Sequence, residues 1–199
     1  MKSRIFIVED EPIIAKDLKS FLEDEGYTVV GFAMDSESAL NKIHTQEIDL
    51  VLLDIMIEGS KSGIEVAAVI REKYDLPFIF LSSLSDDITL KKAVETSPYG
   101  YIVKPFNEKS LKTTIATALH KHKMEKELVI KSNVDSMADV PLSTKEFQIL
   151  EDLVKGLTND QIAERHFIST NTVKYHLKNI FAKLNVSSRS AAISKVIQN

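Results

Sequence analysis

The sequence predicts an α/β protein in two parts, a doubly wound five-stranded parallel sheet followed by a small all-α domain. In the first part, short apolar runs alternate five times with amphipathic stretches, and the second part has no convincing strand pattern. The two parts also differ in charge, with a net charge of −5 for residues 1–123 and +1 for residues 124–199. Alternating strands and helices are typical of a parallel sheet covered on both faces.

The strands are expected where apolar runs are nearly continuous, as in Ile5–Val8 and Phe78–Leu81. Their expected ranges are Arg4–Val8, Thr28–Phe32, Asp49–Leu53, Pro77–Leu81 and Gly100–Val103. Helices are expected near residues 12–25, 36–46, 64–73, 86–96 and 107–122. Continuous apolar runs indicate strands buried on both faces, and ligands of such sheets bind beyond the carboxyl ends of the strands.

The segment 124–141 is polar and mixed, and we interpret it as a linker between a domain at 1–123 and a domain at 142–199. Leu128-Val129-Ile130 is the observation that would instead extend the preceding helix across this segment. Capping residues mark the starts of three helices beyond it: Ser143 with Glu146, Thr158 with Gln161, and Ser169. Gly156 is placed to end the first of them.

Composition excludes several classes of protein. The chain has no cysteine, which excludes disulfides, thiolate metal sites and cysteine nucleophiles. No run approaches the roughly 18 apolar residues that would span a bilayer, and the first four residues lead directly into a strand rather than a signal sequence. We therefore expect a cytoplasmic protein with no membrane partner.

Charged side chains follow several of the expected strands. Glu9 and Asp10 come after the first strand, and Asp54 comes after the third. Ser82 and Lys104 follow the fourth and fifth. Carboxylates that meet at one edge of a sheet repel one another unless a cation intervenes, and hard oxygen ligands suit Mg²⁺. A carboxylate beside a metal ion and a lysine can act as a nucleophile towards phosphorus.

The segments IFIVEDEP, VLLDIM, FLSS and GYIVKPF resemble the receiver domain of bacterial two-component response regulators, over roughly residues 3–122. The resemblance implies a flavodoxin-like fold in which Asp54 accepts a phosphoryl group from a phosphohistidine on a sensor histidine kinase. It also implies an Mg²⁺ cofactor and a set of supporting residues. These are Glu9, Asp10, Asp54 and the Met56 carbonyl for the metal, Ser82 and Tyr101 as the switch pair, and Lys104 for the phosphoryl oxygens.

The sequence departs from the usual receiver pattern at three places. Glu9 replaces a common Asp, and Ser82 stands where Thr is more usual. The loop 58–63 is one residue longer than the commonest version and lacks its proline. We expect unchanged chemistry, with an effect of this loop on kinase choice or on the lifetime of the acyl phosphate.

The third helix of the second part has an apolar stripe and an opposite, basic one. Asn171, Lys174, Tyr175 and Lys178 make the polar stripe, and no acidic residue follows Arg165, whereas six Lys or Arg residues lie from there to the end. The layout fits a helix-turn-helix, with helices at 159–166 and 170–184 joined by a turn at 167–169. Such side chains can reach phosphates and base edges.

The segments LSTKEFQIL, GLTNDQIA, ISTNTVKYHLKNIFAKL and NVSSRSAA resemble the LuxR/NarL-type DNA-binding domain across about residues 142–197. By this resemblance Lys174, Tyr175 and Lys178 face the major groove of double-stranded promoter DNA, and Thr172 and Lys183 contact phosphates. Glu146 and His176 are expected to be structural, and Gln148 is a surface difference from the family.

Together these features predict a phosphorylation-controlled transcriptional regulator. The resemblance to receiver domains implies that phosphorylation repacks the surface around the fourth helix and the fifth strand, which favours a homodimer or frees the DNA-binding unit. RNA polymerase is a further candidate partner. We expect no enzyme activity beyond the protein's own phosphoryl transfer and autodephosphorylation. One alternative is an aspartyl-phosphate phosphatase, which typically has a second Asp two residues after the nucleophile, where this chain has Met56. The other is a protein-binding output module that has lost DNA binding.

Overall fold

The structure is a computed structural model that describes residues 2–83, 87–137 and 140–197. The chain divides into two compact units, Met1–His122 and Lys123–Asn199. Among the described residues, no helix combines the length and the apolar character needed to cross a membrane.

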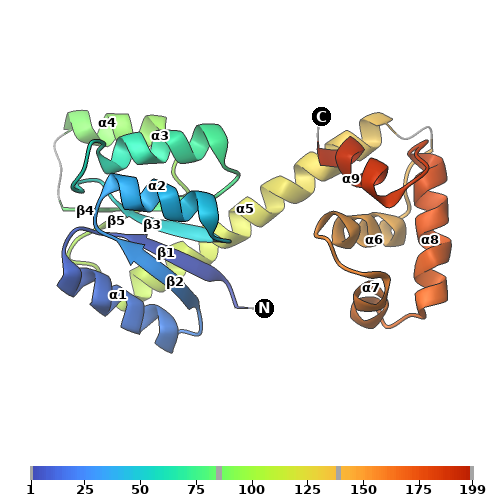
Figure 1. The fold of residues 1–199 in the computed structure, drawn as a ribbon, viewed down its shortest axis with the longest axis horizontal. Helices are drawn as coiled ribbons and strands as arrows, with labels where there is room; N and C mark the ends of the chain where they lie inside the picture. The colour runs from blue at the N-terminus through green and yellow to red at the C-terminus, as the bar shows by residue number, and fades with distance from the viewer. Residues whose placement is uncertain (1, 84–86, 138–139, 198–199) are drawn as a thin grey trace. The chain divides into compact units, whose positions relative to one another are not determined.

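The first unit contains the expected five-stranded parallel sheet, in the order β2-β1-β3-β4-β5 (Figure 1). The strands are β1 (Arg4–Val8), β2 (Thr28–Ala33), β3 (Leu50–Asp54), β4 (Phe78–Ser82) and β5 (Gly100–Val103). The helices are α1 (Pro12–Asp24), α2 (Ser36–Thr45), α3 (Gly63–Lys73), α4 (Asp87–Glu95) and α5 (Glu108–Met137). Residue 86, where α4 was expected to begin, lies outside the described residues. The predicted fold class is confirmed, with strand bounds within one residue of expectation.

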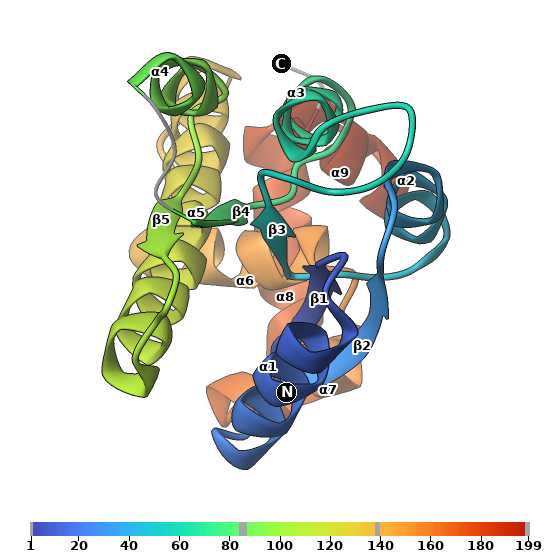
Figure 2. The same ribbon diagram turned by 90° about the vertical axis from the view of Figure 1, so that its left-hand side faces the viewer.

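Helices cover both faces of the sheet (Figure 2). The helices α2, α3 and α4 cover one face, where Phe6, Phe78 and Phe80 are buried. On the other face, α1 and α5 cover a second cluster that includes Ile5 and Ile115. All residues of β3 and β4 are buried, as the continuous apolar runs predicted. Because helices cover both faces of the sheet, polar side chains are expected at the ends of the strands.

The helix α5 differs from the interpretation of 124–141 as a linker, because it continues to Met137. Its last part belongs to the second unit. Val134 is buried and Ile130 packs against the same apolar cluster, and the side-chain Nδ2 of Asn133 donates to the Val196 carbonyl at 2.9 Å. Tertiary contacts therefore hold residues 124–137 of this polar segment in a helix, and the extension that Leu128-Val129-Ile130 suggested is present.

Among its described residues the second unit has helices and no strand, with α6 (Thr144–Val154), α7 (Asn159–His166), α8 (Thr170–Lys183) and α9 (Arg189–Ile197) following the end of α5. The capping boxes predicted at the starts of α6 and α7 are both formed, and the Ser169 hydroxyl accepts from the Thr172 amide at the start of α8. Gly156, at φ +82°, follows the end of α6. Helix α9 was not predicted, although the Ser188 hydroxyl accepts a hydrogen bond from the Ala191 amide at its start.

Candidate functional site

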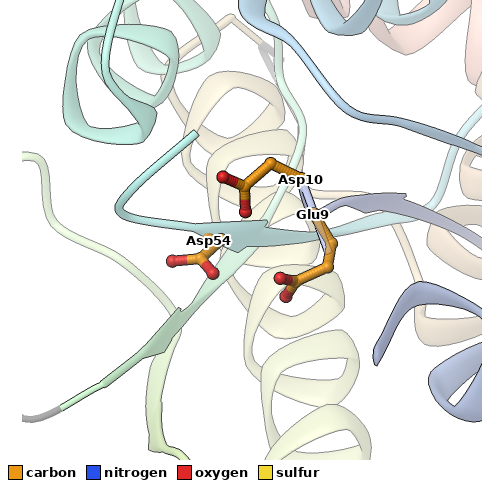
Figure 3. A group of neighbouring side chains, drawn as sticks. All are labelled: Glu9, Asp10 and Asp54. Carbon is orange, nitrogen blue, oxygen red and sulfur yellow. The ribbon is translucent and has the colours of Figure 1, made fainter. Parts of the chain in front are cut away.

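An acidic cluster forms where β1 and β3 end. Val8 pairs with Leu53 in these neighbouring strands, so the residues that follow, Glu9 and Asp54, lie side by side at the carboxyl edge of the sheet. The carboxyl groups of Glu9, Asp10 and Asp54 lie within 4.8 Å of one another and face a common space (Figure 3). The predicted convergence of these three side chains is present in the structure.

Lys104 reaches the same cluster from the end of β5. Its ammonium lies 2.5 Å from Asp54 Oδ2 and 2.7 Å from Glu9 Oε2. Its backbone N–H donates to the Ser82 carbonyl at 2.7 Å, and the Lys104-Pro105 peptide is cis. One lysine thus bridges two carboxylates whose side chains are 0% and 6% exposed.

The electrostatics of the cluster are unbalanced, because three carboxyl groups lie close together and one ammonium contacts two of them. Burial raises the pKa of Glu9 to about 7, with the Asp54 charge adding to the effect and Lys104 opposing it. Burial lowers the pKa of Lys104, but its hydrogen bonds to Asp54 and Glu9 outweigh this and leave it above its ordinary value. The site holds excess negative charge that a divalent cation would relieve.

The donors at this edge fit Mg²⁺. They are carboxylate oxygens, which this ion prefers, and Glu9 Oε2 is buried with no hydrogen bond of suitable geometry among the described residues, although the Lys104 ammonium lies close to it. The Met56 amide donates to Asp54 Oδ1 at 3.0 Å, so Met56 is held beside the cluster while its side chain is 71% exposed. Asp10 is half-buried.

The predicted switch pair lies on β4 and β5. Ser82, at the end of β4, is 2% exposed and its hydroxyl donates to the Ser83 carbonyl at 2.6 Å. Tyr101 pairs with Phe80 across β4 and β5, and their rings lie 6.4 Å apart. Ser82 is therefore at the same edge as Asp54, and Tyr101 lies one strand away and further from that edge.

A second set of contacts, which was not predicted from the sequence, lies in the loop that follows β3. The loop after β3 is bound to the start of α2 through the Glu37 carboxylate, which accepts from the Ser60 amide at 3.0 Å. An acidic residue in the first turn of a helix is a common feature, so its position alone gave no signal of this role.

The second unit contains the predicted helix-turn-helix, with α7, a turn at 167–169 and α8. Val173, Leu177 and Ile180 are buried on one side of α8. The side chains predicted to read DNA are exposed on this helix: Asn171, Lys174, Tyr175 and Lys178. Tyr175 is 63% exposed, and its ring lies beside that of His176 on the same helix.

Four of the six basic residues from Arg165 to the end of the chain have partners within the second unit. The Lys183 ammonium donates to Glu146 Oε2 at 2.8 Å and to the Pro141 carbonyl at 3.0 Å. Arg189 donates to the Leu157 carbonyl at 2.5 Å. Similarly, Lys195 donates to the Leu184 carbonyl at 2.8 Å, and Arg165 lies 3.5 Å from Asp152. Most of the basic side chains from Arg165 to the end of the chain are therefore engaged in contacts within the second unit. Lys174 and Lys178 are the two that remain on the polar stripe of α8.

The other residues singled out from the sequence lie as follows. Glu146 is buried and completes the capping box of α6, so its structural role is confirmed. Thr172 is half-buried and its hydroxyl lies 2.8 Å from that of Ser169. His176 is half-buried beside the Tyr175 ring, and Gln148 is exposed.

Comparisons with known proteins match both units. The family model of the response regulator receiver domain matches residues 5–116, and that of the luxR family of bacterial regulatory proteins matches residues 140–196. The nitrate/nitrite response regulator protein NarP of Escherichia coli is 30% identical over 98% of this chain and 94% of its own length.

Two solved structures are also similar. The receiver domain of a modulated diguanylate cyclase from Desulfovibrio desulfuricans is 35% identical with a TM-score of 0.60, and covers 63% of this chain and 99% of its own. RcsB from Salmonella enterica, solved bound to the rprA promoter with a phosphomimetic, is 22% identical with a TM-score of 0.54, and covers 96% of this chain and 97% of its own. The first unit thus has the receiver fold and the second a LuxR-type DNA-binding domain. The chain belongs to the response regulator family and is a two-component transcription regulator.

Proposed function

We propose that Asp54 accepts a phosphoryl group from a phosphohistidine on a sensor histidine kinase, and that this changes dimerisation and promoter binding. The observation that carries the proposal is the placement of Asp54 against the Lys104 ammonium, with Glu9 and Asp10 within ligand distance of one another and of Asp54. A nearly buried carboxylate with a cation at one oxygen is arranged for nucleophilic attack on phosphorus.

The roles of the residues follow from their positions. An Asp54 oxygen forms a bond to phosphorus, the phosphorus–nitrogen bond of the phosphohistidine breaks, and the leaving imidazole keeps the electron pair and takes up a proton. Lys104 then neutralises charge on the phosphoryl oxygens. Glu9, Asp10, Asp54 and the Met56 carbonyl would hold Mg²⁺, which supplies charge neutralisation when bound.

The response would pass through the end of β4 and the middle of β5. A phosphoryl group adds negative charge and acceptor oxygens, and the Ser82 hydroxyl stands at the same edge of the sheet. A turn of this hydroxyl towards the new group would change the space into which Tyr101 packs. We propose that this repacking favours a homodimer, in which two copies of α8 meet adjacent major grooves.

The output is binding of promoter DNA in the cytoplasm, with Lys174, Tyr175 and Lys178 as the residues that enter the major groove and Asn171 beside them. RNA polymerase is a candidate partner of the bound dimer. In this proposal the protein catalyses only the transfer of a phosphoryl group to Asp54 and the later loss of that group. It does not act as a phosphatase on other substrates, because Met56 stands where phosphatases of similar fold typically have an acid.

The proposal is tested with Asp54→Asn in the full chain. This variant should take up no label from radioactive acetyl phosphate and Mg²⁺, and should unfold like the wild type in urea. Undiminished labelling would exclude Asp54 as the acceptor. A gel shift on promoter fragments with and without beryllofluoride separates DNA binding from the protein-binding alternative, which predicts no shifted band in either state.

A further inference from the structure

The loop that follows β3 is bound along one side to the start of α2. The Ser36 amide donates to the Glu58 carbonyl at 3.0 Å, and the Lys61 amide donates to the Ser36 hydroxyl at 3.2 Å. Between these two, the Ser60 amide donates to Glu37 Oε1 at 3.0 Å. Three backbone groups of an exposed loop therefore have fixed partners on one helix end. We call this set of contacts the Glu37 clasp.

Gly59 allows this approach. It adopts φ +113°, and a Cβ at this position would lie 2.3 Å from the Ser36 hydroxyl oxygen and 2.5 Å from Glu37 Oε2. Both distances are well below van der Waals contact, and the positive φ is itself unfavourable for other residues. The chain thus has a glycine where the loop backbone passes closest to the carboxylate.

The Glu37 carboxylate is charged at all physiological pH values. Hydrogen bonds from Ser60 lower its pKa to about 2, with a further contribution from the Ser36 hydroxyl. Its place in the first turn of α2 also favours the negative charge. The carboxylate is exposed, so its contribution lies in fixing the position of the loop backbone.

The opposite end of the same loop is bound to Asp54. The Met56 amide donates to Asp54 Oδ1 at 3.0 Å, and the Gly63 amide donates to the Ile55 carbonyl at 3.0 Å. Met56 and Ile57 therefore lie between two fixed points, the Asp54 carboxylate on one side and the Glu37 clasp on the other. Contacts on both sides therefore restrict the backbone at Met56.

We propose that Glu37 is a positioning residue for the metal site, which holds the loop after β3 so that the Met56 carbonyl faces the acidic cluster. This rests on the proposed function, in which that carbonyl is a ligand of Mg²⁺. Glu37 touches neither the ion nor the phosphoryl group. Removing residues that orient metal ligands typically weakens metal binding by about 10–100-fold.

The experiment measures Mg²⁺ affinity of the full chain by titration calorimetry, and Mn²⁺ affinity by electron paramagnetic resonance. Glu37→Ala should weaken both by about tenfold. Glu37→Gln, which keeps an acceptor oxygen for the Ser60 amide, should weaken them less, and Gly59→Ala should act like Glu37→Ala without changing the charge. The matched control is Glu58→Gln, which removes a charge from the same loop but keeps the backbone carbonyl that Ser36 uses, and should change affinity less than about twofold.

Three outcomes would overturn the proposal. Metal affinities of Glu37→Ala and Gly59→Ala within twofold of wild type, with normal labelling of Asp54, would show that the clasp does not support the site and would leave the proposed function standing. An equal loss in Glu58→Gln would show that only negative charge matters. Failure of the wild type to bind either ion would overturn the proposed metal site itself, and this inference with it.

Discussion

The acidic edge of the sheet and the polar stripe of α8 use lysine in opposite ways. Lys104 is 11% exposed and lies between two carboxylates that come from strands far apart in the sequence. Lys174 and Lys178 are exposed, one helical turn apart on a single helix, and no partner for either is found among the described residues. A buried lysine between two carboxylates offsets their mutual repulsion and stabilises the site. An exposed lysine without a partner in the same protein is available to bind a ligand.

The largest effect is expected from removing the buried lysine. At neutral pH without metal, Lys104→Met leaves Glu9 and Asp54 close together with no cation, and breaking such a buried pair typically costs about 3–5 kcal/mol. Uptake of a proton by Glu9 would reduce this loss. Urea unfolding of the receiver unit measures it, and added Mg²⁺ should restore part of the stability.

The control for this prediction is Lys174→Met, which should change stability by no more than about 0.5 kcal/mol, as expected for an exposed position. Similar losses in the two variants would mean that the Lys104 contacts do not stabilise the fold, and the contrast between the two regions would disappear.

Gly63→Ala should have the next largest effect. A Cβ at Gly63 would lie 1.8 Å from the Asp54 carbonyl oxygen, so the end of β3 must move. We expect a loss of about 3 kcal/mol, at the upper end of the range for overpacking, together with slower labelling of Asp54 by acetyl phosphate. Normal labelling at wild-type stability would contradict the close packing of α3 against β3.

Its counterpart in the second unit is Gly156→Ala. Gly156 has φ +82°, but a Cβ added there would meet no atom within 4 Å, so only backbone strain of about 1 kcal/mol is expected. Labelling of Asp54 should be unchanged in this variant.

Replacing Lys174 and Lys178 by alanine tests the other side of the comparison. Removing a lysine that contacts a phosphate should reduce the slope of log affinity against log salt concentration by about one unit. A base contact would instead cost about 1–3 kcal/mol and relax preference at one position. Fluorescence anisotropy with promoter DNA at several salt concentrations measures both. Lys195→Ala is the control, because Lys195 is bound to the end of α8, and its salt slope should match that of the wild type.

If the double alanine variant binds promoter DNA as tightly as the wild type, α8 is not the reading helix. Tyr175→Ala separates the two kinds of contact further, since the loss of an uncharged residue should change sequence preference more than the salt slope.

The smallest effect is expected on the pH dependence of stability, through the Glu146–Lys183 ion pair. Burial raises the pKa of Glu146, but hydrogen bonds from Lys183 and Ser143 outweigh this and hold it below its ordinary value. The unfolded chain therefore takes up the proton first on acidification, and the stabilisation is present above about pH 4.5 and lost below it. Glu146→Gln should be less stable than wild type at pH 7 by about 1 kcal/mol, and the difference should shrink towards pH 3. A difference independent of pH would show that the charge of Glu146 plays no part.

Much of this molecule could be predicted from the sequence because its signals are local. Continuous apolar runs indicated the buried strands, and Ser143, Thr158 and Ser169 marked three helix starts correctly. The convergence of Glu9, Asp54 and Lys104 could be predicted as well, because parallel strands end at one edge of a sheet.

What the sequence left open or did not predict depends on contacts between distant segments. The sequence left a linker and a longer helix as alternatives for the segment after residue 123, and the continuation of α5 depends on burial of Val134 by helices that come later in the chain. The Glu37 clasp joins residues 23 positions apart. The tail after Arg165 suggested a basic DNA-facing surface, but the roles of Arg189 and Lys195 depend on which carbonyl groups are left unsatisfied at or just beyond the ends of α6 and α8.

The long helix α5 determines where the DNA-binding domain of this chain could be exchanged with that of a related protein. Leu111 and Ile115 belong to the apolar core of the first unit, and Ile130 and Val134 belong to that of the second. A segment that carries the complete core of the DNA-binding domain therefore begins near residue 123, some twenty residues before the sequence motifs of its family. A graft or evolutionary recombination that joined the halves at residue 142 would strip the second core of a packing layer, so viable chimaeras should have their junction inside the helix.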